Sequence, residues 1–281
     1  MACMYDDMTK HTKNHWPSLP AQCYLPINHC NLPAAILGSL SFQRHPVALV
    51  LDGVAELHHD LWQRLHGMAH PVKRARQFMD YMTVHFLLEE PEEAGYQPQQ
   101  LHTRIKMDYR QLLRGWMFDP DNREGAVLKG WVESRFGLLP TWHKGAITSP
   151  DAEAYRLYLQ ERTAGIYNTN ALETQLDLLY SYCQYELAQE YAEDAQLQLY
   201  RGINPGSVSH LPGKQGVMLF NNLNACSRTV DRADEFGSEV YSVQVPRAKV
   251  FYYSGLLPGL LQGEDEYLVI GGLYDVQKFL L

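Results

Sequence analysis

The sequence predicts an α+β fold, in which a helical N-terminal portion is followed by a β-rich C-terminal portion. Apolar residues recur at spacings of three and four through much of the first 195 residues, as they do on the buried face of a helix. After Asp194 this pattern gives way to the period-two alternation of a half-buried strand, first at residues 197–202. Because helical and extended segments are separated along the chain, the pattern excludes the alternating βαβ class. We expect a mainly helical region over residues 1–195, packed on a β-rich region over residues 196–281.

The composition is that of a globular protein with a large core. The chain has 281 residues, of which 46% are hydrophobic and 20% charged, enough for one large domain or a domain with an appended lobe. A net charge of −8 argues against general nucleic-acid binding, which needs a cationic surface. No apolar stretch approaches the roughly 18 residues of a membrane span, and the N-terminus lacks the apolar part of a secretory signal. Five scattered cysteines are typical of reduced thiols, so we expect a cytoplasmic protein.

The N-terminal elements follow from apolar spacing and from prolines. The first 50 residues are rich in proline, asparagine and histidine and predict an irregular arm that packs onto the body. Residues 55–90 have a helical pattern with Leu57 and Leu61 on one face, and Pro71 is expected to break it into two helices. Further helices are predicted near residues 101–116 and 124–136.

Two more helices are expected before the strands begin. Ser149-Pro150-Asp151 is typical of a helix start, with serine as the cap and proline and an acid in the first turn. A helix over residues 171–193 carries one long apolar stripe, which consists of Leu172, Leu176, Leu179, Tyr180, Cys183 and Leu187.

The β-rich part is predicted to contain short strands and one short helix. The strands are expected at residues 197–202, 217–220, 223–227, 239–245, 250–253, 267–270 and 273–279. The helix is expected to open at residues 227–231 and to end near Gly237.

Three features of the β-rich part suggest a chemical site. Arg201 lies on the first predicted strand, Ser227 ends a strand before a helix, and Glu264-Asp265-Glu266 opens a later strand. Taken singly, such an arginine or such a Glu-x-Glu pair is usually a surface feature, and such a serine is usually an N-cap. Their order, spacing and surroundings together favour a functional site.

The same residues resemble the motifs of the arginine-specific ADP-ribosyltransferase superfamily. Tyr200-Arg201-Gly202 resembles the arginine motif, and Glu264-Asp265-Glu266 resembles the Glu-x-Glu motif. Residues 223–227, followed by Ala233, Phe236 and Gly237, resemble the serine block and the helix behind it. Within this block Ala225 and Cys226 stand where the family has serine and threonine, so only Ser227 carries over.

The N-terminal half resembles one branch of this superfamily, the dinitrogenase reductase ADP-ribosyltransferases of nitrogen-fixing bacteria. Residues 58–62, 78–82 and 130–137 carry this likeness and make it essentially full length. The resemblance implies a core of two packed sheets over residues 196–281 that binds NAD as its substrate. It also implies that the acceptor is an arginine of the nitrogenase iron protein (dinitrogenase reductase), which modification inactivates reversibly, and that a PII signalling protein regulates the transferase.

Chemistry and resemblance together give each motif residue an expected role. Cleavage of the bond between nicotinamide and ribose passes through an oxocarbenium-like cation, which Glu266 would stabilise while it binds the ribose 2′-hydroxyl. Glu264, two residues earlier on an alternating strand, would face the same way and take a proton from the acceptor arginine. Arg201 would bind the pyrophosphate, and Gly202 would let its backbone approach the nicotinamide amide. The expected catalytic residues are Glu266, Glu264 and Ser227, which positions Glu266; the expected NAD-contacting residues are Arg201, Gly202, Tyr200, Ser227 and Glu266.

Two other activities would use the same residues. In an NAD glycohydrolase water would replace the acceptor, and the intact Glu264 argues against this. A binding module without activity is disfavoured because Arg201, Ser227 and Glu266 are all retained. A mono-ADP-ribosyltransferase with another protein target stays open as well.

The remaining candidate residues have structural explanations. His66 and His70 are four apart, as two ligands on one helix face are, but no third ligand stands out, so no metal site is predicted. Cys183, Trp116, Trp131 and Trp142 are expected in the core. The leucine- and glycine-rich residues 256–263 are expected to shape the surface that meets the acceptor.

Overall fold

The fold is α+β, as predicted. A computed structural model of the chain describes residues 17–89, 107–167, 169, 171–204, 209–210, 216–260 and 265–279. Its N-terminal helices are η1 (Ala21–Cys23), α1 (Ala34–Leu37), α2 (Leu40–Arg44), α3 (Val54–Leu57), α4 (His59–His66), α5 (Pro71–His85), α7 (Tyr109–Phe118), α8 (Arg123–Phe136), α9 (Glu153–Ile166) and α10 (Leu172–Glu190). The rest contains β1 (Gln196–Ile203), β2 (Ser209–His210), β3 (Val217–Ser227), α11 (Val230–Asp234), β4 (Glu239–Pro246), η2 (Arg247–Lys249), β5 (Val250–Tyr253) and β6 (Glu266–Phe279).

One antiparallel sheet joins the six described strands in the order β2-β3-β1-β4-β6-β5. The 14-residue strand β6 pairs with β3 and β5 along its first part and with β4 at its end. Because β1 in turn pairs with both β3 and β4, the pairings among β1, β3, β4 and β6 close into a ring. The strands expected to form two packed sheets therefore belong to one continuous sheet, because β6 pairs with β3 and β5 and also with β4.

Strands β3 and β6 are each longer than the sequence pattern predicts. Two expected strands, 217–220 and 223–227, join in β3 through an irregularity between Phe220 and Leu223. A Cβ atom at position 271 would lie only 1.7 Å from the carbonyl oxygen of Asn221, at this irregularity. Gly271 is therefore needed for β6 to run past the bulge.

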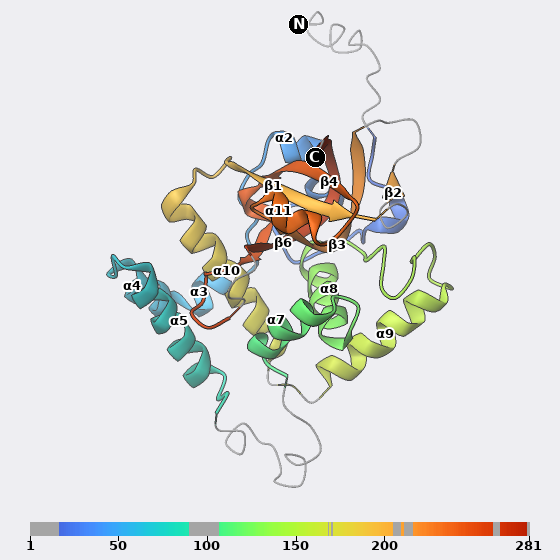
Figure 1. Cartoon of the computed structure of the whole chain (residues 1–281). Helices are drawn as coiled ribbons and strands as arrows, with labels where there is room; N and C mark the ends of the chain where they lie inside the picture. Colours follow the sequence, from blue (N-terminus) through green and yellow to red (C-terminus); the bar gives the residue numbers. More distant parts are fainter. Residues whose placement is uncertain are drawn as a thin grey trace, which may run out of the picture.

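Helices of the N-terminal portion cover the sheet and share its core. In Figure 1, α2 lies above the sheet, against β4 and β6, whereas α8 and α10 lie below it, against β3 and β5. Trp131 of α8 contacts the rings of Phe251 and Tyr180, with centroids 4.8 and 6.0 Å apart. All six residues of the predicted stripe on α10 are buried, including Cys183. At about 1.5–3 kcal/mol for each large apolar side chain, this shared core stabilises both portions together.

A buried ion pair fastens α5 to α10. Arg74 donates from Nε and Nη2 to the two carboxylate oxygens of Glu186, at 2.7 Å each, and both side chains are buried. The third guanidinium nitrogen, Nη1, donates to the carbonyl oxygens of Met68 and Ala69. Because all three guanidinium nitrogens have acceptors, these hydrogen bonds offset the free-energy cost of burying the charged pair.

Three local expectations are wrong. Helix α9 begins at Glu153 and not at the predicted Ser149 cap, because Ala152 N–H donates to the Ser149 carbonyl and closes a separate turn first. Leu57 is 72% exposed because α3 ends there and α4 starts afresh at His59, so the apolar spacing does not run through. The arm is not wholly irregular, since it contains η1, α1 and α2. The break at Pro71 is confirmed, and this proline occupies the first turn of α5.

Candidate active site

Neighbouring strands bring Arg201, Ser227 and Glu266 to one cavity. In the sheet register, Ser227 of β3 is opposite Tyr200 of β1 on one side and Glu266 of β6 on the other. A cavity of about 290 Å³ lies against them. Its lining consists of Trp116, Met117, Pro120, Tyr200, Arg201, Gly202, Ile203, Asn204, Ala225, Ser227, Ala233, Phe236 and Glu266. We call it the carboxylate cavity.

Glu266 is the acidic group of the carboxylate cavity. It is the first residue of β6 and is only 8% exposed. Its Oε1 accepts a hydrogen bond from Trp116 Nε1 at 3.1 Å, and its backbone oxygen accepts one from Ser254 N–H at 2.8 Å. Helix α7 and the loop after β5 therefore both fix this end of β6.

The backbone turns directly before Glu266. Asp265 has a φ of 43°, in the left-handed region, and is not part of the strand. Strand β6 therefore begins only at Glu266, directly after this left-handed residue. Glu264 itself lies outside the described residues.

Arg201 is held tightly between β1 and β3. Its Nη1 donates to the Ala225 carbonyl at 2.5 Å, and its guanidinium carbon is 5.4 Å from the centre of the Phe220 ring. Burial lowers the pKa of Arg201, an effect that the neighbouring Cys226 and Glu266 oppose. Burial raises the pKa of the neighbouring Cys226 thiol to about 11, so this thiol is neutral beside the Arg201 guanidinium. Within the described structure, Arg201 Nε is buried without a hydrogen-bond partner.

The two neighbours of Arg201 line the carboxylate cavity and also make structural contacts. A Cβ on Gly202 would lie 1.9 Å from the Ala233 carbonyl oxygen, so glycine is required here for α11 to pack on β1. Tyr200 also lines the carboxylate cavity, but its hydroxyl accepts from Gln198 Nε2 and its ring packs edge-on against Phe279.

A second cavity, of about 320 Å³, adjoins the first. Trp116, Pro120, Arg201 and Ala225 line both. The other residues of its lining are Asp121, Lys129, Thr141, Trp142, Ala146, Leu219, Asn221, Leu223 and Asn224. We call it the tryptophan cavity. Arg201 thus stands where two hollows of similar size meet.

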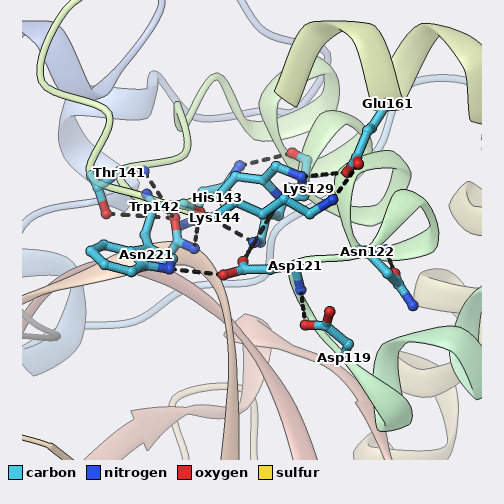
Figure 2. A network of polar contacts seen from close by, with 12 residues as sticks. Asp119, Asp121, Asn122, Lys129, Thr141, Trp142, His143, Lys144, Glu161 and Asn221 are labelled. Atoms are coloured by element: carbon cyan, nitrogen blue, oxygen red, sulfur yellow. Dashed lines mark hydrogen bonds and ion pairs between the residues drawn. The ribbon is translucent and has the colours of Figure 1, made fainter. Parts of the chain in front are cut away.

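A buried polar network forms the wall of the tryptophan cavity (Figure 2). Lys129 Nζ donates to Asp121 Oδ1 at 2.6 Å and to His143 Nδ1 at 3.3 Å, and His143 Nε2 is 2.8 Å from Glu161 Oε2. Because a lysine ammonium only donates, Nδ1 is the acceptor and the imidazole proton resides on Nε2, facing Glu161. Burial lowers the pKa of His143, against the opposing effect of Glu161, and so favours this neutral form. The network ties α8 and α9 to the cavity wall.

Trp142 and Asn221 extend this network to the cavity surface (Figure 2). Trp142 Nε1 donates to Asp121 Oδ2 at 2.8 Å, and Asn221 Nδ2 donates to the Trp142 carbonyl at 3.0 Å. Trp142 is 39% exposed, so the prediction that it lies in the core is wrong. Trp131 is buried, as predicted.

Trp116 lines the site, although its sequence pattern predicts only a core residue. It was expected in the core, and it is buried, but it also lines both cavities and binds Glu266. An apolar helical stripe does not distinguish a tryptophan that only packs from one whose N–H meets a carboxylate 150 residues later.

The loop expected to shape an acceptor surface is largely buried. Leu256, Leu257 and Leu260 are each at most 3% exposed, because they belong to the hydrophobic core. Pro258 and Gly259 are its exposed described residues. Residues 261–263 lie outside the described part.

The described residues contain neither a metal-binding cluster nor a membrane-spanning helix. No group of three or more histidine, cysteine, aspartate or glutamate side chains is placed there to hold a metal ion. Within the same ranges, no helix combines the length and apolar character that a membrane crossing requires.

Comparison with known proteins assigns the chain to a family. The family described as dinitrogenase reductase ADP-ribosyltransferase matches residues 27–278. The NAD(+)–dinitrogen-reductase ADP-D-ribosyltransferase of Rhodospirillum rubrum is 36% identical over 262 residues, which cover 90% of this chain and 95% of the relative. No solved structure matches the chain significantly. The match spans both the helical portion and the strands that carry Arg201, Ser227 and Glu266, and the chain belongs to the dinitrogenase reductase ADP-ribosyltransferase family.

Proposed function

We propose that this protein transfers ADP-ribose from NAD to an arginine of dinitrogenase reductase, the acceptor named for its relative. The observation that carries the proposal is the register that sets Ser227 opposite Glu266, with Arg201 beside both, in one cavity. Modification of the acceptor would inactivate it, and a hydrolase would restore it.

The two cavities match the two-part shape of NAD. NAD has two nucleoside ends joined by a pyrophosphate, and Arg201 lines both cavities where they meet. A guanidinium fork binds phosphate oxygens well, and the buried Nε–H of Arg201 has no partner among the described residues. We place the pyrophosphate at Arg201, nicotinamide and its ribose in the carboxylate cavity, and the adenosine end toward Trp142.

Glu266 and Glu264 divide the chemistry in this proposal. As the bond to nicotinamide breaks, positive charge develops on the ribose, and the Glu266 carboxylate stabilises that charge. The acceptor guanidinium attacks the anomeric carbon, and Glu264 accepts the proton that it loses. Ser227, opposite Glu266 in the sheet, helps to hold the carboxylate in place. The region over residues 196–281 carries NAD and the chemistry, and the helical region over residues 1–195 completes the site through Trp116.

The test incubates the purified chain with labelled NAD and dinitrogenase reductase. Glu266→Gln should lose both transfer and NAD cleavage, and Glu264→Gln should lose transfer while some NAD cleavage persists. Asp265→Asn is the matched control, because it removes the carboxylate between them and asparagine tolerates the left-handed backbone found there. Transfer at the normal rate by Glu264→Gln would contradict its role.

The same assay separates the alternative activity. If nicotinamide is released and no protein takes up label, the chain is an NAD glycohydrolase. If a different protein in a lysate takes up label at arginine, the acceptor assignment is wrong and the transferase assignment stands.

Regulation by a PII signalling protein belongs to this proposal through the family resemblance. Adding a purified PII protein to the transfer assay should change the rate of labelling. An unchanged rate, in the presence and absence of its nucleotide ligands, would remove the regulator from the account.

A further inference from the structure

Trp116 joins the helical portion to the acidic group of the carboxylate cavity. It lies near the C-terminal end of α7, is 3% exposed, and donates from Nε1 to Glu266 Oε1 at 3.1 Å. An indole N–H can only donate, so this contact favours the ionised, accepting form of the carboxylate. It also fixes the direction in which the carboxylate points.

Helix α7 is itself held rigidly, so Trp116 has a defined position. Asp108 caps its first turn by accepting from Gln111 N–H at 2.9 Å, and Gln175 of α10 accepts from Tyr109 N–H at 3.1 Å. At the other end, Asn122 Nδ2 donates to the Gly115 carbonyl at 2.8 Å. A donor anchored at both ends of its helix can orient its acceptor with little loss of side-chain freedom on binding.

Strand β3 offers Glu266 less than the superfamily pattern would. Ala225 occupies the place of a serine and has no hydroxyl, while it lines both cavities together with Trp116. Among the described residues, Arg201 from β1 and Cys226 from β3 both interact electrostatically with this carboxylate.

We propose that Trp116 is a positioning residue for the transfer reaction: its indole N–H orients the Glu266 carboxylate toward the ribose. The inference rests on the proposed function, since it assigns to Trp116 an effect on the same carboxylate. It also gives the helical portion a part in the chemistry, because α7 supplies the donor.

The test compares two tryptophan-to-phenylalanine variants in the transfer assay. Trp116→Phe keeps an aromatic ring and removes the N–H. Trp131→Phe is the matched control, because Trp131 is equally buried and its Nε1 also donates to a carboxylate, Asp177 Oδ1, at 2.7 Å, away from both cavities. The measurements are kcat and KM for NAD across a pH series, with NAD affinity from calorimetry.

For Trp116→Phe we expect kcat to fall about 10- to 100-fold through misorientation of the carboxylate, with KM for NAD within about two-fold of the parent. The acid limb of the kcat profile should move to higher pH, because a hydrogen bond to the charged form of the carboxylate is lost. Trp131→Phe should lower thermal stability and leave the acid limb where it is. If the role of Trp116 were only structural, the acid limb of the kcat profile would not move, and kcat would not fall while KM for NAD stays the same.

An unchanged kcat with an unmoved acid limb in Trp116→Phe overturns the inference. If that variant does not fold, a benzothiophene analogue of tryptophan at position 116, which has the same shape without the N–H, replaces it with the same expected outcomes. Failure of the parent chain to transfer ADP-ribose at all would instead refute the proposed function, so the two failures are distinct.

Discussion

The buried lysine at the end of η2 gives a stability prediction with a definite sign. Lys249 is fully buried, donates from Nζ to the Gly271 carbonyl at 2.8 Å, and lies 4.7 Å from the centre of the Tyr274 ring. Burial lowers its pKa from 10.5 to about 7. Between these two values the unfolded chain holds a proton that the folded protein has lost.

The free energy of unfolding therefore rises with pH over this window. The slope contributed by one such group approaches about 1.4 kcal/mol per pH unit. From pH 7.5 to 9.5 the parent should gain about 2.5 kcal/mol relative to Lys249→Met, which has no proton to exchange at this position. Below about pH 7 both states hold the proton, and the contribution of Lys249 is flat.

Urea unfolding of both proteins at the two pH values measures this gain. Methionine matches the length and apolar stem of lysine, and the unpaired Gly271 carbonyl costs the variant the same at every pH. Tyrosines and cysteines that titrate in the same range cancel in the difference between the proteins. If the difference in unfolding free energy is the same at pH 7.5 and 9.5, the lysine is not buried as described and the reasoning fails.

Three further predictions concern the Arg74–Glu186 ion pair, the contact of Gly202 with α11, and Arg201. Glu186→Gln should lower the unfolding free energy by about 3–5 kcal/mol, because it leaves the Arg74 charge buried without a counter-charge; urea denaturation checks it, and a loss below 1 kcal/mol contradicts it. Gly202→Ala should cost about 1–3 kcal/mol and weaken NAD binding, since its Cβ would lie 1.9 Å from the Ala233 carbonyl; calorimetry with unchanged affinity and melting temperature would count against it. Arg201→Lys should raise the Kd for NAD about 10-fold or more, because a single ammonium cannot fork onto the pyrophosphate; an equal Kd would place the pyrophosphate elsewhere.

Long, periodic segments were predictable from the sequence. The helices α8 and α10 are confirmed, and all six residues of the predicted stripe on α10 are buried. Short elements were not, since tertiary contacts decide them. The Ser149 carbonyl closes a turn of its own, and the two halves of β3 merge because Gly271 leaves space for a bulge at Asn221.

The candidate site was predictable as a set of motifs but not as a geometry. Arg201, Ser227 and Glu266 meet because β1, β3 and β6 are neighbours, a pairing that no local pattern encodes. The left-handed backbone of Asp265, directly before β6, was not predictable from the period-two pattern. Trp116 was missed because its functional contact depends on where α7 docks, and that is set by residues far away in the chain.

The most direct measurement of the central claim is peptide mass mapping of dinitrogenase reductase after incubation with NAD and this protein. We expect one ADP-ribosylated arginine with the parent chain and none with Glu266→Gln, although the variant retains its fold. An unmodified acceptor despite consumption of NAD, or modification at the parent rate by Glu266→Gln, would contradict it.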